Sequence, residues 1–261
     1  MSEDIQLTVT IQALQYADID ACARITAAAF STDRHTIVKQ LGGKPFDMFD
    51  VSRDGFLATL HRKTYIYVKA VDEAGNIVGH AGWGFRGIDE EKIPRKGPSD
   101  EPPPTEEEHE DQNEDNAVKE EIQRKEDGKK KGIDRLHEIE DDDMKNMMAE
   151  LMPPGTSCMF FIGLIVDPSH QSHGVGSALI EYGNAIADRL NIFTWVHSSD
   201  QAWKAYAKFG FDIVKELDIE LDEYAPTAPG EKWAKKLEGT GEGVTKEKWG
   251  HYVIRYMKRL P

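Results

Sequence analysis

Two apolar segments, joined through a glycine-containing loop and a helix, constrain the fold more than any other part of the sequence. The continuous apolar run Met159–Val166 is typical of a strand that is buried on both faces. The loop Gln171–Gly176 follows it, and Ser177–Leu190 carries the apolar spacing of a helix. The second apolar segment, Ile192–His197, predicts another strand. This order forms a βαβ unit, so we expect parallel or mixed strands at the centre of the sheet.

Helix and strand patterns alternate through much of the remaining chain. Further helices are expected from Ile19 onward, over Thr32–Leu41 and over Asp200–Phe209. The polar segment Glu223–Lys248 contains prolines and glycines and is expected to be a long loop, which could lie over an acceptor site. The chain is therefore predicted to be an α/β protein. The further strands are expected at Ile5–Leu14, Thr64–Val71, Ile77–Phe85, Phe211–Leu221 and Tyr252–Met257.

Residues 89–155 are far more acidic than the rest of the chain. They hold 23 acidic and 11 basic residues, a net charge of −12, whereas the whole chain carries −15. Between residues 97 and 131 large apolar side chains are almost missing, so burial cannot offset the entropy lost on ordering, and we predict disorder there. From Gly132 to Leu151 the apolar spacing predicts an amphipathic helix. We expect one domain, 1–261, that carries an acidic insertion at 89–155.

Two interpretations of this acidic insertion are open. It could attract a cationic substrate or partner electrostatically. It could also be a solvated, variable loop, which is the commoner role of a run of charges.

The composition argues against several classes of function. A pI of about 5.0 is unfavourable for binding nucleic acid through its phosphates. The longest apolar run, Cys158–Val166, is far shorter than the roughly 20 residues that a membrane span requires. The N-terminus is acidic and lacks the pattern of a secretory signal, so a cytoplasmic protein is expected. Cys22 and Cys158 stand in apolar surroundings and predict reduced thiols in the core.

The loop Gln171-Ser172-His173-Gly174-Val175-Gly176 is the sharpest chemical feature. Its small residues let the backbone approach a ligand closely. The free amides of the first helical turn, aided by the helix dipole, form a site for an anion such as a pyrophosphate. An ordinary strand-to-helix turn is the alternative. The loop lacks the third glycine of a dinucleotide fingerprint and the Gly-Lys-Ser/Thr of a Walker loop.

A second motif, Tyr206-Ala207-Lys208-Phe209-Gly210-Phe211, follows one strand later. A strand, a [QR]-x-x-G-x-G/A loop that opens a helix, a strand and then Y-x-x-x-G-F together resemble the Gcn5-related N-acetyltransferases (GNAT). The resemblance covers Leu164–Phe211 strongly, and residues 5–85 by pattern. It is closest to a fungal-type small-molecule subgroup, because Ser199 stands seven residues before Tyr206. Ala-Phe-Ser-Thr-Asp at 29–33, Trp83 and the polar insertion also fit that subgroup.

This resemblance implies the GNAT fold, in which a central mixed sheet of six to seven strands is splayed between two parallel strands and flanked by helices. It implies that acetyl-CoA, as co-substrate, lies in the cleft between Met159–Val166 and Ile192–His197. Ser199 would stand near the pantetheine arm, which would pair with the backbone of Leu164, Ile165 and Val166. The amides that would hold the pyrophosphate belong to Gln171, Ser172, His173, Gly174, Val175, Gly176 and Ser177.

The resemblance also implies a catalytic acid. Tyr206 stands where the family's tyrosine protonates the departing CoA thiolate. A phenol with a pKa near 10 can donate a proton without ionising beforehand. Core packing beside Phe209 and Phe211 is the alternative role of Tyr206.

The general base is harder to assign because the buried strand carries no carboxylate. His197 stands where the fungal-type subgroup often has a Glu, and a histidine at a strand end could take a proton near pH 7. A structural histidine is the alternative. Asp167, next in line as a base, precedes a proline and is expected to be a turn residue. His170 and His173 have no cysteine or carboxylate at ligand spacing, so no metal site is predicted.

These features predict an acetyl-CoA-dependent N-acetyltransferase that acts on a primary amine of a small molecule. A protein or peptide N-acetyltransferase and a non-catalytic acyl-CoA-binding module are the alternatives. Three aromatic residues could line the acceptor pocket, although core packing is their commoner role. They are Trp83, Phe85 and Trp203.

Overall fold

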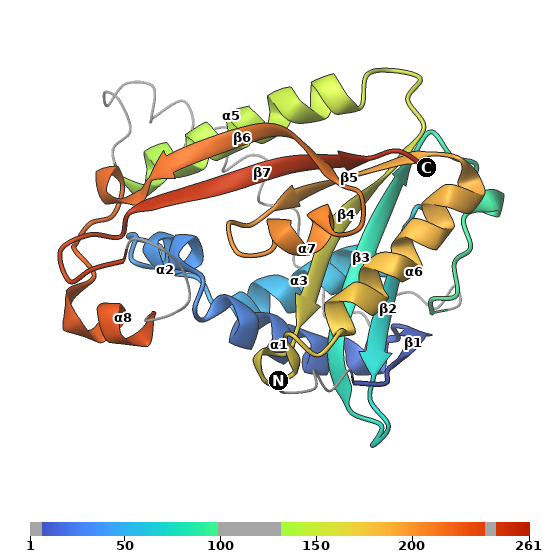
Figure 1. Ribbon diagram of the computed structural model, residues 1–261, viewed down its shortest axis with the longest axis horizontal. Helices are drawn as coiled ribbons and strands as arrows, with labels where there is room; N and C mark the ends of the chain where they lie inside the picture. The colour runs from blue at the N-terminus through green and yellow to red at the C-terminus, as the bar shows by residue number, and fades with distance from the viewer. Residues whose placement is uncertain (1–6, 99–131, 238–243) are drawn as a thin grey trace, which may run out of the picture.

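The structure, a computed structural model, describes residues 7–98, 132–237 and 244–261 (Figure 1). Its centre is a seven-stranded mixed sheet in the order β1-β2-β3-β4-β5-β7-β6, in which only β4 and β5 are parallel neighbours. The predicted α/β fold with a mixed central sheet is thereby confirmed. The strands are β1 (Thr10–Ala13), β2 (Tyr65–Val71), β3 (Ile77–Arg86), β4 (Cys158–Val166), β5 (Phe193–Ser198), β6 (Asp212–Glu220) and β7 (His251–Arg259).

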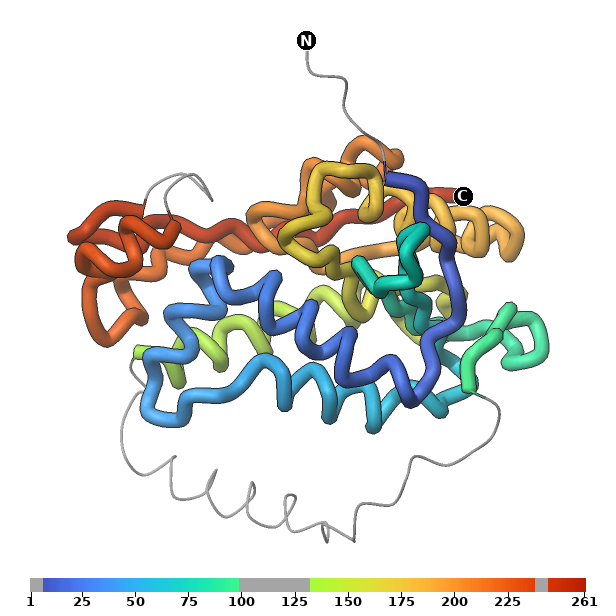
Figure 2. Tube along the Cα trace, turned by 90° about the horizontal axis from the view of Figure 1, so that it is seen from below, coloured from blue at the N-terminus to red at the C-terminus, as the bar shows by residue number. Residues whose placement is uncertain are grey.

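Helices cover both faces of the sheet. On one face α6 crosses the central strands, and its Gly183 lies directly over Trp83 of β3. On the other face lie α1, α2, α3 and α5, which Figure 2 shows together below the red and orange strands. The α-helices are α1 (Ile19–Phe30), α2 (Arg34–Gln40), α3 (Met48–Thr59), α5 (Ile133–Leu151), α6 (Val175–Leu190), α7 (Trp203–Ala207) and α8 (Gly230–Lys236). Short 3-10 helices are η1 (Tyr16–Asp18), η2 (Glu90–Lys92), η3 (Pro168–His170) and η4 (Leu221–Glu223).

The strand β4 departs from the prediction that it is buried on both faces. Cys158 and Met159 are fully buried, but Ile162 is 41% exposed and the residues after it are partly exposed. Ile162 is skipped in the pairing of β3 with β4, so it forms a β-bulge. The neighbour β5 pairs with β4 only at the first three residues, so one edge of β4 is open beyond Phe160.

Two helices were not foreseen at their places in the sequence. The helix α3 has only Phe56 buried, and Val51 is 50% exposed, so it carries too weak an apolar stripe to be recognised. Its N-cap Asp47 accepts a hydrogen bond from the amide of Phe49 at 2.7 Å. The helix α8 interrupts the segment 223–248, which was expected to be a loop. The fully buried Trp249 follows this segment, and its indole donates to the carbonyl of Thr227 at 2.7 Å.

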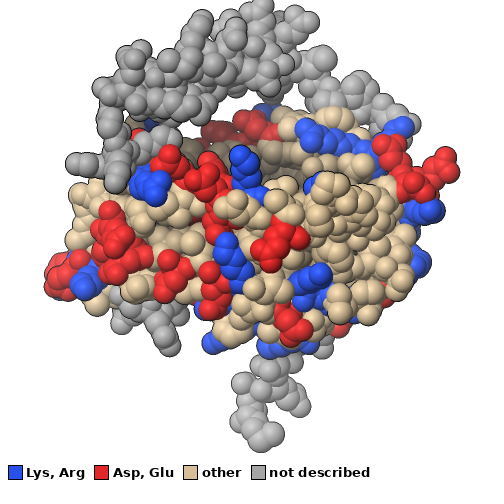
Figure 3. Space-filling view, turned by 90° about the horizontal axis from the view of Figure 1, so that it is seen from above, with Lys and Arg blue, Asp and Glu red and all other residues tan. Residues whose placement is uncertain are grey.

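The helix predicted in the second half of the acidic insertion is present as α5. Leu136 and Met147 are its most buried residues, and they pack against two different parts of the core. The disorder predicted over 97–131 falls almost entirely on residues outside the described ranges. On the face seen in Figure 3, acidic and basic side chains are interspersed rather than gathered by sign.

Two further expectations concern the membrane and the cysteines. None of the helices in the described part of the chain combines the length and the apolar content that crossing a bilayer requires. Cys22 and Cys158 are both free and fully buried, as predicted. Burial raises the pKa of the Cys22 thiol to about 12 and that of Cys158 to about 11, so both thiols stay protonated at neutral pH.

Candidate active site

A cavity of about 570 Å³ opens where β4 and β5 separate. The two strands are paired at Cys158, Met159 and Phe160 and then diverge. One wall is formed by the diverging strands, and the opposite wall by α1, α2 and α3. The lining residues from β4, β5, the turn after β5 and α7 include Phe161, Ile162, Gly163, Leu164, Ile165, Val196, His197, Ser198, Ser199 and Tyr206.

The open edge of β4 gives this cavity unused backbone groups. Its other edge is paired with β3, where Gly79 stands opposite Val166 and Ala81 opposite Leu164. On the side of β5 the residues after Phe160 have no strand partner. Of the three residues predicted to meet a pantetheine arm, Leu164 and Ile165 line the cavity, whereas Val166 does not.

The glycine-containing loop lies at the end of β4, next to the cavity but outside its lining. Gly174 is the N-cap of α6 with a φ of 89°, and Ser172 also has a positive φ, of 64°. The amide groups from Ser172 to Ser177 donate to no acceptor among the described residues. Gln171 anchors the loop by donating to the carbonyl of Val166 at 3.2 Å. The exposed start of α6 can therefore receive an anion through several amides at once.

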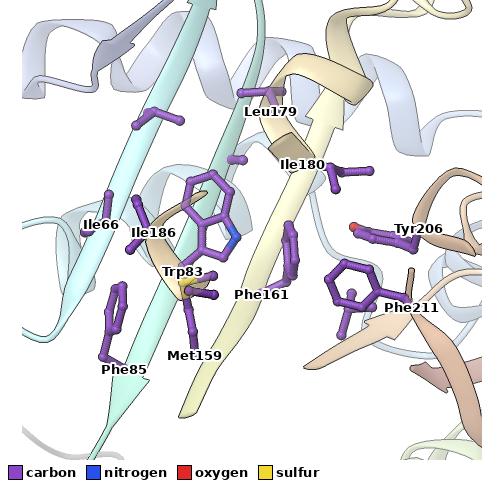
Figure 4. Packing of buried hydrophobic residues seen from close by; sticks show 14 of the residues in the cluster. Ile66, Trp83, Phe85, Met159, Phe161, Leu179, Ile180, Ile186, Tyr206 and Phe211 are labelled. Atoms are coloured by element: carbon purple, nitrogen blue, oxygen red, sulfur yellow. The ribbon is translucent and has the colours of Figure 1, made fainter. Parts of the chain in front are cut away.

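Tyr206 joins the hydrophobic core to the cavity. Its ring packs edge-on against Phe161 and Phe211, with centroid distances of 5.2 and 5.7 Å. Figure 4 shows the hydroxyl group pointing from α7 toward β4. The side chain is 4% exposed and lines the cavity, and burial raises the pKa of the phenol well above its ordinary value. Packing and access to the cavity are thus combined in one residue.

His197 is the one exposed residue of β5, between the buried Val196 and Ser198, and it interacts electrostatically with Glu140 and Asp143 of α5. Its ring is open to the cavity and lies 5.0 Å from the ring of Tyr256, its partner on β7. Protein nevertheless surrounds the ring on most sides, and this burial lowers the pKa of His197 to about 4. The ammonium group of Lys39 also lowers this pKa, while the carboxylates of Glu140 and Asp143 on α5 raise it. His197 is therefore neutral near pH 7, and it does not titrate there as the sequence alone suggested.

Ser199 lines the cavity on a turn that two arginines hold in place. The carboxylate of the next residue, Asp200, accepts hydrogen bonds from Arg34 and Arg255, each at 3.0 Å. Arg34 is 2% exposed and also donates to the carbonyl of Trp249 at 3.1 Å. This network ties the end of β5 to α2, so the two walls of the cavity are joined.

Sequence reasoning missed a polar chain on the wall of the cavity opposite β5. His80 of β3 is 3% exposed, and its Nε2 lies 3.0 Å from the hydroxyl of Thr26 on α1. Ser52 of α3 donates to the same hydroxyl at 3.2 Å. Burial lowers the pKa of His80 to about 4, so it is neutral. These residues come from three separate elements, so no local sequence motif could predict that they lie together.

A second missed group lies at the start of α2. His35 lines the cavity, stacks on Tyr252 and shares a hydrogen bond with Glu140 of α5. The hydroxyl of Tyr252 donates to Asp33 at 2.8 Å. Only the spacing of the amphipathic helix at 133–151 hinted that this segment touches the domain.

The three aromatics considered for an acceptor pocket lie elsewhere. Trp83 is fully buried and Phe85 is 6% exposed, both in the core beneath α6 (Figure 4). Trp203 stacks against the guanidinium of Arg255 at 4.7 Å and does not line the cavity. Core packing, the alternative role, is what these residues do.

The remaining candidates lie in the turn after β4. Asp167 accepts hydrogen bonds from Ser169, including its amide at 2.9 Å, and so acts as the turn residue that was predicted. His170 contacts Asp167, and His173 is exposed. Within the described ranges, no three His, Cys, Asp or Glu side chains converge in a way that could hold a metal ion.

Known proteins share this sequence pattern and fold. The family model described as Acetyltransferase (GNAT) family matches residues 87–211. No curated protein matches the sequence. Arylalkylamine N-acetyltransferase 2 from Aedes aegypti is similar in structure, with a TM-score of 0.56 at 14% identity over 97% of this chain and 99% of that one. A polyamine N-acetyltransferase from Drosophila melanogaster gives a TM-score of 0.54 at 15% identity over 97% and 100%.

A bacterial structure extends this likeness. It comes from Corynebacterium glutamicum and is described as histone acetyltransferase HPA2 and related acetyltransferase. It gives a TM-score of 0.50 at 15% identity, and the match covers 98% of this chain and 97% of that one. At such low identities the likeness to all three structures concerns the fold.

Proposed function

We propose that this acyltransferase, which has the GNAT fold, transfers an acetyl group from acetyl-CoA to a primary amine of a small molecule. The observation that carries the proposal is the cavity of about 570 Å³, where the open edge of β4, Tyr206 and His197 meet. A cavity of this size suits a small-molecule ligand.

The backbone of the chain fits the acetyl donor at two points. The unpaired edge of β4 beside Leu164 and Ile165 suits an arm that carries amide groups of its own. The free amides of Ser172–Ser177 suit a pyrophosphate. These two sites would hold the donor between the start of α6 and the open edge of β4, and Tyr206 would be available to its thioester. When bound, acetyl-CoA supplies the activated acetyl group.

Tyr206 and His197 can move the protons that the transfer requires. A bond forms between the amine nitrogen and the acetyl carbon, and the bond between that carbon and sulfur breaks. The raised pKa of Tyr206 keeps its phenol protonated and ready to donate to the leaving thiolate. His197 takes a proton from the nitrogen once the new bond has formed. That nitrogen is then positively charged and strongly acidic, so a base with a pKa of about 4 suffices.

The acceptor class is supported by the cavity and by the structural relatives. Two of the similar structures are named for acetylation of arylalkylamines and polyamines, which are small amines. The spacing of Ser199 and Tyr206 supports a place in the fungal-type small-molecule subgroup. The two free buried cysteines support a reducing, cytoplasmic setting.

The experiment that tests this function has two steps. Titration calorimetry with acetyl-CoA and with CoA, without an acceptor, should show saturable binding of both. Release of free thiol is then followed with 2-phenylethylamine, spermidine and a lysine-containing peptide blocked at its N-terminus. We expect turnover with a small amine and none with the peptide. Failure of acetyl-CoA to bind at millimolar concentration would contradict the proposal.

A further inference from the structure

A histidine–carboxylate pair borders the cavity, and the mechanism above does not use it. His35, from the first turn of α2, lines the cavity, and its Nε2 shares a hydrogen bond with Oε1 of Glu140 on α5. The two side chains are only 15% and 14% exposed. The ring of His35 also stacks on that of Tyr252, with centroids 5.0 Å apart and planes inclined by 21°. Two elements thus fix the position and the plane of this imidazole.

The partner of Nε2 determines which nitrogen of His35 is free. An ionised carboxylate only accepts hydrogen bonds, so Nε2 carries the proton and Nδ1 is left with a lone pair. Burial opposes ionisation of Glu140, but its contacts with His35 and Lys39 outweigh burial and lower its pKa. Nζ of Lys39 donates to the second carboxylate oxygen at 2.8 Å. A charged carboxylate in this position stabilises the imidazolium that forms when Nδ1 takes a proton.

The proposed reaction needs a base of this kind because the amine acceptor is protonated when it binds. An alkylamine has a pKa of about 10, so near pH 7 it is an ammonium ion with no lone pair for attack. The other histidines of the cavity are His80, which is buried, and His197, whose ring protein surrounds on most sides, and this desolvation lowers the pKa of each to about 4. Neither forms a hydrogen bond with a carboxylate among the described residues, so neither can compete for the proton of an ammonium ion.

We propose that His35, oriented by Glu140, removes the first proton from the ammonium group of the acceptor. The proposal rests on the proposed acetyl transfer. One N–H bond breaks, its electron pair stays on nitrogen, and the proton passes to Nδ1 and on to solvent. The second proton leaves the nitrogen after the C–N bond has formed, and one proton ends on the CoA sulfur by way of Tyr206. One proton in total is released for each acetyl group transferred.

This assignment gives α5 a part in the reaction. In this proposal His35 is the catalytic residue, because it lines the cavity that would take the acceptor, and Glu140 is a positioning residue that acts through it. Charged and titratable groups surround the pair on several elements. Next to the imidazole are Glu140 on α5, His197 on β5, and Tyr252 with its partner Asp33. Lys39 on α2 binds Glu140, and two further groups of α5 interact with these neighbours, His137 with Lys39 and Glu140, and Asp143 with His197.

The test compares two acceptors that differ in basicity. The first is 2-phenylethylamine, which is charged near pH 7. The second is its 2,2-difluoro analogue, whose amine is a much weaker base and is largely neutral there. His35→Gln keeps a donor for Glu140 but cannot take a proton, and Glu140→Gln removes the charge. We expect both variants to lower kcat/KM about 100-fold for the charged amine and less than about threefold for the neutral one.

The matched control is Glu138→Gln, on the exposed side of the same helix, which should leave both rates unchanged. The loss with 2-phenylethylamine should also shrink as the pH is raised toward the pKa of that amine, because solution then supplies the neutral form. Equal losses with both amines would show that the pair only ties α2 to α5, and unchanged rates would show that it has no role. Either result overturns the proposal.

A spectroscopic measurement separates failure of this proposal from failure of the proposed function. In the wild-type protein with bound CoA, nitrogen-detected NMR of the histidine rings should show His35 protonated at Nε2. Glu140→Gln should shift those signals, and so should 2-phenylethylamine. If no amine is acetylated, the proposed function is wrong. The spectra still show whether Glu140 sets the protonation of His35. A proton on Nδ1, or signals that neither change moves, would refute the assignment of His35.

Discussion

The ring of Tyr206 packs against Phe161 and Phe211, and its hydroxyl group borders the cavity. Replacing the side chain by one of equal shape separates these two contributions. The aromatic contacts are worth about 0.5–1.5 kcal/mol beyond their burial, and phenylalanine keeps them. The hydroxyl has no partner in the described structure whose loss would leave a buried group unpaired.

We therefore expect Tyr206→Phe to keep the fold and the affinity for acetyl-CoA while kcat falls by about 100-fold or more, since the thiolate loses its proton donor. Thermal unfolding, calorimetry with acetyl-CoA and thiol-release kinetics measure the three quantities. The control is Phe209→Tyr, which adds a hydroxyl two positions past the helix and should leave kcat unchanged. Unchanged turnover in Tyr206→Phe would remove this residue from the mechanism.

At the scale of single residues, the sequence revealed the parts of the site that belong to one continuous motif. Tyr206, Ser199 and the loop before α6 stand at fixed spacings within the continuous stretch of chain from β4 to α7. His35 and Glu140 lie 105 positions apart and His80 and Thr26 lie 54 apart. Such pairs depend on how α1, α2 and α5 pack on the sheet, and no local pattern records that packing.

Among the elements, those with a strong apolar period were predicted and those without one were not. The strand β4 has a continuous apolar pattern and the helix α6 a periodic one, and the bounds of both were predicted to within two residues. The helix α3 lines the cavity, and Phe56 is its one buried residue, so its apolar stripe is too thin to be recognised from the sequence. The apolar pattern did not indicate the open edge of β4, because it reports the burial of side chains and not the partner of a backbone. Only the family resemblance implied that the two parallel strands separate.

At the N-terminus of α6, the proposed anion site can be tested by a substitution that does not disturb the packing of the core. A Cβ on Gly176 would lie 3.7 Å from Val166 and 3.9 Å from Leu164, which are ordinary contacts, and alanine is the better helix former. We expect Gly176→Ala to fold with unchanged or slightly higher stability. Its Kd for acetyl-CoA should rise on the order of tenfold, because the methyl group stands where the anion must approach the amides.

Calorimetry and thermal unfolding measure these two effects. Gly43→Ala, where a Cβ meets open space, is the matched control and should leave the Kd for acetyl-CoA as it is. An unchanged Kd in Gly176→Ala would show that the anion is bound elsewhere on the protein.

For the whole molecule, the buried histidines make stability depend on pH. The pKa of His80 falls from 6.5 to about 4 on folding, so between these values the unfolded chain binds more protons than the folded one. The stability is therefore complete above pH 6.5 and is lost as the pH falls toward 4. At pH 5 the loss from His80 is about 2 kcal/mol. His197 acts in the same direction, although its contact with solvent makes its share smaller.

Urea unfolding at pH 7 and pH 5 measures this dependence. His80→Gln keeps a polar partner for Thr26 and should reduce the drop in unfolding free energy between the two pH values by about 2 kcal/mol. His61→Gln, at a histidine on the surface, should retain the full drop. A variant at His80 with the wild-type drop would mean that this imidazole can be protonated within the folded protein.

The sheet consists of two halves, β1–β4 and β5–β7–β6, that share a border of three residue pairs. The arrangement is that of a V whose apex is packed around Met159 and Thr194, both fully buried, and whose arms enclose the reacting groups. The angle between the arms is set at that apex, so a change of side-chain volume there is amplified along the strands. The width of the acceptor site therefore depends on residues that no ligand contacts. Substitutions at the apex can change which substrate fits, while every side chain that lines the site stays the same.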